Sequence, residues 1–335
     1  MNNKITRYIL ALSKIKGVGP AFIKKRLTIF QKYSNDINSF KIAFSKSLSE
    51  KEEKKIDIEY YLDEANILLE ECKKENIVVI DISNILYPKN LLELTDPPPI
   101  LYAKGNLNLL DKKIIGIIGT RKATNLGETI ASRVGGFFSK DFAIINGLVD
   151  GIDKSAISNK NNIYSNVIGI LSGGLNFNYT SSKITKDLAE KVLNNNGLLL
   201  SESQPNQKED SFSGSKSSRI QAGLSDSLIL IQSSIDGGSK YTLNSFKNLN
   251  RPLGIINFSN NKYFNIDESF SANRLLLKEE KIGLSFICEK INDKNIELDN
   301  LKYIDKINIT KIVRIQNKED YLVLVNLVNR KSKLF

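Results

Sequence analysis

Short turns rich in glycine and hydroxyl side chains follow five apolar segments of this 335-residue sequence, and such turns can hold phosphate groups. At glycine the backbone amides approach an anion closely, and arginine offers a planar fork to phosphate oxygens. The turn residues that we predict to bind phosphate are Gly119, Thr120, Arg121, Lys122, Asn146, Gly147, Gly173, Gly174, Gly237, Gly238, Ser239 and Thr242. One glycine-rich turn is more often only a turn, but several at one sheet edge favour an anion-binding site.

The residues needed for several kinds of catalysis and cofactor binding are absent from the sequence. The chain has no histidine, which excludes Ser-His-Asp and Cys-His catalysis and argues against a zinc hydrolase. Its two cysteines form no CxxC pair that could ligate zinc. The turn at residues 116–121 differs from the GxGxxG dinucleotide motif, and no acidic residue ends the next strand to hold a ribose. We therefore expect no catalytic residues, no metal and no cofactor.

Two aspartates in the second glycine-rich turn, Asp150 and Asp153, could form a catalytic acid pair. Acidic residues beside a glycine turn more often cap the helix that follows, so we expect a structural role for both. The aromatic residues Phe177 and Tyr179 follow the Gly173-Gly174 turn and could stack on nucleic-acid bases.

A further candidate phosphate site lies near the N-terminus, where Gly17 and Gly19 separate two stretches of helical periodicity. Two helices joined by such a turn form a helix-hairpin-helix, whose exposed amides can cradle a backbone phosphate. Lys24 and Lys25 lie on the second helix and would add positive charge. The alternative is a plain glycine turn between two packed helices.

Apolar segments that alternate with helical stretches predict the framework that positions these turns. The predicted strands are 114–118, 142–145, 167–171, 198–200, 228–231 and 253–256, and the predicted helices are about 125–139, 152–160, 182–195, 238–249 and 271–279. Short apolar strands separated by helices are typical of an α/β, Rossmann-like fold with a doubly wound, mainly parallel sheet. Ligands of such folds lie outside the carboxyl ends of the strands, where the glycine-rich turns fall.

The chain divides into three predicted units. Residues 1–75 indicate a helical, helix-hairpin-helix-like domain, residues 85–285 the Rossmann-like domain, and residues 286–335 a small basic appendage in which strand and helix are both open. The net charge of +11 is concentrated at the ends, because residues 1–36 carry +7 and residues 301–335 carry +5. Such charge favours a polyanionic partner, although a base-composition bias could also explain the C-terminal excess. We see neither an apolar run of membrane-spanning length nor a secretory signal, and expect a cytoplasmic protein.

Motifs between residues 85 and 285 resemble the DprA/Smf family of DNA-processing proteins. They include Tyr87-Pro88, Leu101-Tyr102-Ala103-Lys104-Gly105, Gly119-Thr120-Arg121, residues 146–153, residues 197–202, Arg219, Ala222-Gly223-Leu224-Ser225, Asn250-Arg251-Pro252 and residues 272–276. The resemblance implies a protein that binds single-stranded DNA, protects incoming DNA in natural transformation or recombination, and assists the loading of RecA. It also implies that Arg121 contacts DNA phosphates, with Lys122, Lys216 and Arg219 as basic neighbours, and we expect a homodimer.

The sequence departs from this family at several positions. Ile157 stands where histidine is common, Gln232 where glutamate is usual, and only Arg219 remains of a Phe-Pro-x-Arg-Asn-Arg segment. Two other functions therefore stay open. One is a nucleotide-binding Rossmann enzyme or sensor, and the other is a degenerate member that serves as a scaffold for protein interactions.

Overall fold

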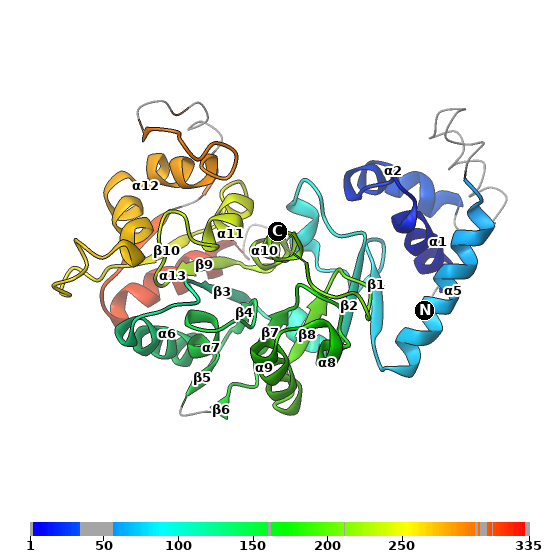
Figure 1. The fold of residues 1–335 in the computed structure, drawn as a ribbon, viewed down its shortest axis with the longest axis horizontal. Helices are drawn as coiled ribbons and strands as arrows, with labels where there is room; N and C mark the ends of the chain where they lie inside the picture. Colours follow the sequence, from blue (N-terminus) through cyan, green and yellow to red (C-terminus); the bar gives the residue numbers. More distant parts are fainter. Residues whose placement is uncertain are drawn as a thin grey trace.

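The computed structural model describes residues 3–33, 56–159, 162–210, 212–298, 301, 307–309 and 311–331. A nine-stranded sheet runs through the molecule and is flanked by helices (Figure 1). In these described residues, no helix combines the length and the apolar character that crossing a membrane requires.

The strands of the main sheet follow the order β1-β2-β8-β7-β4-β3-β9-β10-β11. Their bounds are β1 (Val78–Asp81), β2 (Ile100–Gly105), β3 (Ile114–Ile118), β4 (Ala143–Asn146), β7 (Val167–Ile170), β8 (Leu198–Ser201), β9 (Ser227–Leu230), β10 (Leu253–Ile256) and β11 (Ile312–Ile315). From β8 to β11 all neighbours are parallel, whereas β2 is antiparallel to both β1 and β8. The predicted α/β, doubly wound, mainly parallel sheet is thus confirmed.

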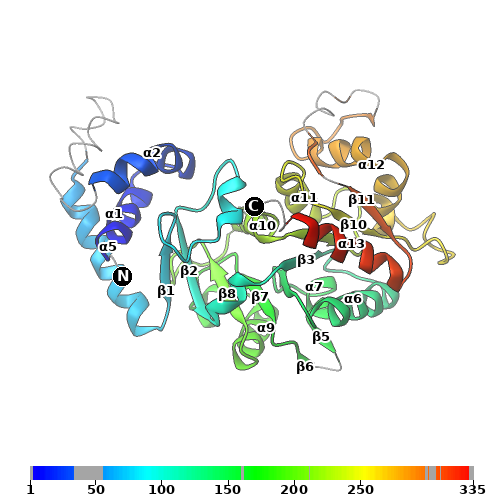
Figure 2. The same cartoon turned by 180° about the vertical axis from the view of Figure 1, so that it is seen from behind.

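Helices cover both faces of the sheet. They are α1 (Asn3–Lys14), α2 (Pro20–Tyr33), α5 (Ile58–Lys74), α6 (Asn125–Phe138), α7 (Ile152–Ala156), α8 (Phe177–Thr180), α9 (Lys183–Asn194), α10 (Ser213–Leu224), α11 (Ser239–Phe246), α12 (Ser271–Glu289) and α13 (Lys318–Lys331), with 3-10 turns at Lys89–Glu93, Leu107–Asp111 and Glu268–Phe270. In both views α11 and α12 lie above the strands, while α6 and α9 lie below them (Figures 1 and 2). The six central strands are buried along their whole length, which explains their continuous apolar sequences.

All six predicted strands are present, with ends that shift by one or two residues at most. The helix predicted to run to residue 160 ends at Ala156, and a short hairpin, β5 (Ser158–Asn159) and β6 (Asn162–Ile163), follows it. The last predicted helix ends at residue 279, where the structure has a kink: Glu280 has a φ of 45°, and a second helical stretch continues to Glu289.

The two flanking units are joined to the main sheet at its opposite edges. Helix α1 packs against α5 and β1, and the buried Thr6 hydroxyl donates to the Asp81 carboxylate across 2.7 Å. At the other edge β11 pairs in parallel with β10. The C-terminal segment, expected as a small appendage, therefore contributes a strand to the same sheet.

Candidate functional site

The predicted turns after β3 and β4 and the start of α11 line one cleft of about 810 Å3, which we call the edge cleft. It lies at the carboxyl ends of the strands, where open α/β sheets bind their ligands. Eight predicted residues line it: Gly119, Thr120, Arg121, Lys122, Gly147, Gly238, Ser239 and Thr242.

The turns after β3 and β4 hold each other in place. Gly151 has a φ of +76°, and a side chain there would collide with the carbonyl oxygens of Thr120 and Arg121. The amide of Ile152 donates to the carbonyl of Thr120 (3.2 Å), whose own amide donates to the carbonyl of Gln232 (2.8 Å). The backbone that carries Arg121 is therefore fixed.

Two cations and one hydroxyl of the edge cleft lack protein partners. Arg121 and Lys122 are exposed, and neither side chain forms a hydrogen bond or salt bridge with a residue that the structure describes. Ser239 is only 6% exposed, and its Oγ finds no hydrogen-bond partner among the described residues. A buried hydroxyl without a partner costs about 1–3 kcal/mol. The N-terminus of α11 adds partial positive charge, so an anion in the cleft would meet favourable charge. Rotation of the Ser239 side chain, whose Oγ is covered by protein, would let this hydroxyl donate to the anion.

Asp153 places a buried carboxyl group in the same cleft. Its Oδ2 accepts a hydrogen bond from the amide of Gly147 (2.9 Å), so it closes the turn after β4 instead of capping α7. Burial raises the pKa of Asp153 from 3.8 to about 7, against the lowering effects of the Gly147 and Val149 amides and of Arg121. This carboxyl group therefore changes its charge near neutral pH, beside the place where an anion would bind.

Gln232, which stands where the family usually has glutamate, is fully buried at the end of β9. Its Oε1 accepts from the amide and the hydroxyl of Thr124, each at 3.1 Å, and its Nε2 donates to Ser269 Oγ (2.7 Å). A Cβ on Gly127 would collide with this amide group. Gln232 therefore positions the first turn of α6 and adds no charge to the cleft.

Four of the predicted turn residues do not line the edge cleft, and neither do the predicted basic residues Lys216 and Arg219. The Asn146 side chain is fully buried, donates to the carbonyl of Asp153 (2.9 Å) and accepts from the amide of Leu148 (3.1 Å). Side chains on Gly173 and Gly174 would collide with neighbouring backbone, chiefly that of residues 204–209. Gly237 donates its amide to the carbonyl of Ser234 (3.0 Å) within a turn. These residues shape the loops, and sequence spacing does not separate that role from ligand binding.

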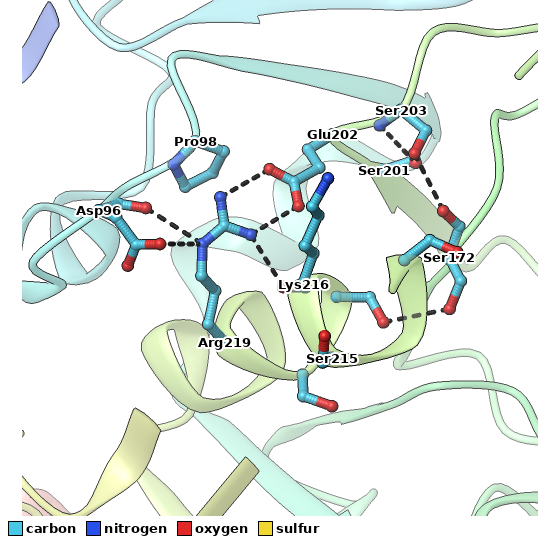
Figure 3. A network of polar contacts seen from close by, with 12 residues as sticks. Asp96, Pro98, Ser172, Ser201, Glu202, Ser203, Ser215, Lys216 and Arg219 are labelled. Atoms are coloured by element: carbon cyan, nitrogen blue, oxygen red, sulfur yellow. Dashed lines mark hydrogen bonds and ion pairs between the residues drawn. The ribbon is translucent and has the colours of Figure 1, made fainter. Parts of the chain in front are cut away.

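Arg219 is held by acidic side chains of the protein. Its Nη1 and Nη2 donate to the two oxygens of Glu202 (2.5 and 2.6 Å), and its Nε lies 3.1 Å from the Asp96 carboxylate. Figure 3 shows the guanidinium between these two residues. Burial alone would lower the pKa of Arg219, but the bonds to Glu202 and the charge of Asp96 raise it overall. The arginine therefore joins α10 to the loops before β2 and after β8, and is not free to bind phosphate.

Lys216 is exposed and lines a second cleft of about 490 Å3, on the other side of Ser215 from the edge cleft. Arg219, Asn244 and Lys247 line the same cleft. Lys216 and Arg219, the two basic residues of the segment 214–219, thus line the same cleft, and Arg121 does not line it.

Part of the edge cleft is supplied by α10, a helix that the sequence pattern did not predict. Phe212, directly before this helix, is 71% exposed and lines the cleft together with Tyr241 of α11. Phe177 is buried and Tyr179 is 80% exposed, and neither lines the cleft. The sequence signal for Phe212 is its place beside a run of glycine and serine, because such small residues do not cover an aromatic ring.

The N-terminal glycine turn joins α1 to α2, as both the helix-hairpin-helix and the plain turn would require. Gly17 has a φ of +91° between α1 and α2, and neither Gly17 nor Gly19 has a neighbour that a side chain would meet. Lys25 is exposed, whereas the Lys24 ammonium donates to the carbonyls of Leu92 (2.8 Å) and Leu94 (2.7 Å). Lys24 therefore ties α2 to the sheet domain.

The chain is similar to a known protein family and to several known proteins. The family model described as DNA recombination-mediator protein A matches residues 78–281. The DNA processing protein DprA of Bacillus subtilis is 31% identical over 190 residues, which are 56% of this chain and 63% of that protein. Protein Smf of Synechocystis is 30% identical over 263 residues, 76% of this chain and 65% of that protein. The chain thus aligns with slightly less than two thirds of each relative's length.

Two solved structures are similar to the fold. DprA from Streptococcus pneumoniae superposes with a TM-score of 0.63 at 20% identity, covering 96% of this chain and 97% of that one. DprA from Helicobacter pylori, a structure described for its single-stranded DNA binding mode, gives a TM-score of 0.52 at 25% identity over 61% of this chain and 88% of that one. With the family model spanning most of the sheet domain, the chain belongs to the DNA recombination-mediator protein A family, the DprA/Smf family of DNA-processing proteins.

Proposed function

We propose that this protein binds single-stranded DNA through the edge cleft. The observation that carries the proposal is the buried, unpartnered Ser239 hydroxyl in the cleft that also holds the uncommitted cations Arg121 and Lys122. Membership of the family and the DNA-binding mode described for the Helicobacter pylori protein support it.

The geometry suggests how a strand would bind. A phosphate would accept hydrogen bonds from Ser239 Oγ and from the guanidinium fork of Arg121, with Lys122 adding charge. The exposed rings of Phe212 and Tyr241 border the same cleft and offer surfaces for stacking bases. No step of this binding needs a nucleophile or a general acid, and we propose a binding protein that is not an enzyme.

The test is a salt-series titration of fluorescein-labelled oligothymidine by anisotropy. We expect Arg121→Ala to weaken binding roughly tenfold and to reduce the slope of log K against log salt by about 0.7, the value for one phosphate contact on a single strand. Ser239→Ala should weaken binding without changing the slope, because it removes no charge. Lys191→Ala, an exposed lysine of α9 outside the cleft, is the control. Unchanged affinity and slope for Arg121→Ala would contradict the site.

Two other functions predict different outcomes, which thermal unfolding and the binding titration distinguish. A nucleotide-binding enzyme or sensor would be stabilised against thermal unfolding by nucleoside monophosphates but not by oligonucleotides. A degenerate scaffold would bind neither. The uncommitted cations and the unpartnered hydroxyl favour an anionic ligand over the scaffold.

The family membership supports a wider role, which we propose as part of the same function. The protein would act in the cytoplasm as a homodimer, protect incoming single strands in transformation or recombination, and assist the loading of RecA. Sedimentation with and without oligothymidine tests the homodimer, and assembly of RecA on coated single strands tests the loading.

A further inference from the structure

A further groove, separate from the edge cleft and from the cleft that Lys216 lines, lies between α6 and α13. It has a volume of about 500 Å3, and its floor includes Phe137 and Tyr321, whose ring centroids are 4.9 Å apart. The last residues of β10 and β11, Ile256 and Ile315, also line it. We call it the α6–α13 groove. Five of its twelve lining residues belong to the segment 315–321, which lies outside the stretch that the family model matches.

The charged residues that line this groove are all cationic. Arg133, Lys140 and Lys318 are exposed, and none forms a hydrogen bond or salt bridge with a residue in the described part of the chain. The first turn of α13 contains two acids, Glu319 and Asp320, and neither lines the groove. The Asp320 carboxylate accepts from the amides of Gln316 (2.7 Å) and Asn317 (3.1 Å). An apolar, aromatic floor with uncommitted cations at the rim is complementary to a nucleotide, whose base is planar and whose phosphate is anionic.

One face of α6 connects the groove to the edge cleft. Leu126, Ile130, Arg133 and Phe137 follow at intervals of four and three residues, so they lie on the same side of the helix, and Lys140 comes two residues after the helix ends at Phe138. Leu126 is 38% exposed, and Lys122, which lines the edge cleft, lies just before the helix begins. The 14 residues of α6 span about 21 Å at 1.5 Å each. A stacked strand that advances about 3.4 Å per nucleotide covers this length with about six nucleotides.

We propose that the α6–α13 groove is a second nucleotide subsite, which receives a base and a phosphate of the same DNA strand about six nucleotides from the edge cleft. The inference rests on the proposed function, because the strand is anchored at Arg121. It assigns a binding role to the C-terminal segment, which otherwise only completes the sheet. It also predicts that affinity rises when a strand becomes long enough to reach the groove.

The first test compares oligothymidines of five and fifteen nucleotides by anisotropy. For the longer strand, the double variant Arg133→Ala/Lys140→Ala should bind roughly tenfold more weakly, and its salt slope should fall by about 1.4, which is 0.7 for each of two phosphates. For the shorter strand both quantities should stay as in the wild type. The matched control is Lys183→Ala/Lys191→Ala, which removes two exposed cations from α9. Equal losses for both strands, or no loss for the longer one, would overturn the subsite.

The second test uses the absence of tryptophan from the chain. Phe137→Trp places a single fluorophore in the groove, and a stacked base quenches its emission. We expect quenching by the fifteen-nucleotide strand and none by the five-nucleotide strand or by thymidine monophosphate at the same concentration. Quenching by the free nucleotide would show a nucleotide site independent of the strand and would refute the proposal, as would an unquenched complex. If the wild type binds neither strand, the proposed function itself fails, which anisotropy reveals separately.

Discussion

Arg121 and Arg219 show, at the scale of single residues, that a basic side chain in a predicted site does not always bind the ligand. Both were expected to meet DNA phosphates, but Arg219 is 8% exposed and faces the carboxylates of Glu202 and Asp96. A buried cation requires paired charge, and here the protein supplies it. Arg121 is exposed and forms no salt bridge with a residue that the structure describes, so its charge is available to a ligand. Burial and pairing, which sequence alone does not give, separate the two roles.

We predict that Asp153 makes the proposed DNA binding at the edge cleft sensitive to pH. Because burial raises the pKa of this carboxyl to about 7, it is mostly ionised at pH 8 and mostly neutral at pH 6. An ionised Asp153 repels a phosphate in the cleft, so affinity for oligothymidine should rise as the pH falls from 8 to 6. Two unit charges about 6 Å apart at an effective dielectric near 40 interact by about 1.4 kcal/mol, which sets a limit of roughly tenfold. Asp153→Asn should bind tightly at both pH values.

The control for this measurement is Asp150→Asn, which removes a carboxylate from the same loop. Asp150 is half exposed and lies 3.4 Å from the Lys154 ammonium, so this variant should keep the pH dependence of the wild type. The chain has no histidine, which removes the usual source of a titration in this range. A pH dependence that survives in Asp153→Asn would assign the effect to another group. The same pKa shift affects folding. Because the pKa of Asp153 is raised in the folded state, the free energy of unfolding declines as the pH rises from about 4 to about 7, and Asp153→Asn removes this decline.

At the scale of elements, the crossing of α6 and α7 sets the position of the edge cleft. Helix α7 carries Asp153, and α6 follows the turn of Arg121. At their contact Gly135 is so close to α7 that a Cβ would overlap the carbonyl oxygen of Ala156. The backbone of α7 cannot yield to a methyl group without moving the whole helix, so this glycine fixes the distance between the two elements.

Substitution of this glycine should therefore affect both folding and binding. We expect Gly135→Ala to lower the free energy of unfolding by about 1–3 kcal/mol, the usual cost of overpacking, and to weaken oligothymidine binding because Asp153 and its loop shift. Chemical denaturation and anisotropy measure the two effects. Gly136→Ala is the control, since its Cβ would come within 2.9 Å only of the Tyr164 hydroxyl at the end of a side chain. Both variants gain about 1 kcal/mol of helix propensity, so equal stabilities would contradict the close contact.

The elements that sequence predicted well are those whose pattern is local. Strands such as β3 (IIGII) and β10 (LGII) consist only of apolar residues and glycine, and burial on both faces favours that pattern. Helix α10 was missed because serine and glycine fill its first turns, and tertiary contacts stabilise it, with nine of its twelve residues buried. Strand β11 was left open because its four residues alternate in burial and its partner β10 lies far away in sequence. Of the site, the glycine turns after β3 and β4 were predictable, whereas Phe212 was overlooked although it stands beside a run of glycine and serine.

At the scale of the whole molecule, the strand order places the N-terminal helices and strand β11 at opposite edges of the sheet. The N-terminal helices pack beside β1 at one edge of the sheet, and β11 leads into α13 at the other. The carboxyl ends of β3 and β4, which form the edge cleft, are central in this order. The helices α1 and α2, which carry most of the +7 excess of residues 1–36, therefore lie at one edge of the sheet, beyond the edge cleft. Such a position suits a long strand that extends from the cleft, because these helices can neutralise phosphates that the cleft does not reach.

The N-terminal contribution can be isolated, because only some of its cations are uncommitted. Arg7 and Lys14 pair with acids of α5, and Lys24 is bound to backbone carbonyls, whereas Lys16 and Lys25 are exposed near the glycine turn. We expect Lys16→Ala/Lys25→Ala to lower the salt slope for a strand of about 30 nucleotides by roughly 1.4 and to leave a five-nucleotide strand unaffected.

Two exposed lysines at the end of α5 provide the control for this last measurement. Lys73→Ala/Lys74→Ala removes the same charge from the same helical unit but far along the chain from the glycine turn, and should leave the slope unchanged. Thermal unfolding should be the same for both double variants, because none of the four side chains forms a salt bridge in the described structure. If both lower the slope equally, the unit acts only through its net charge. If neither does, the turn is a connection between packed helices, and the strand does not reach this edge of the sheet.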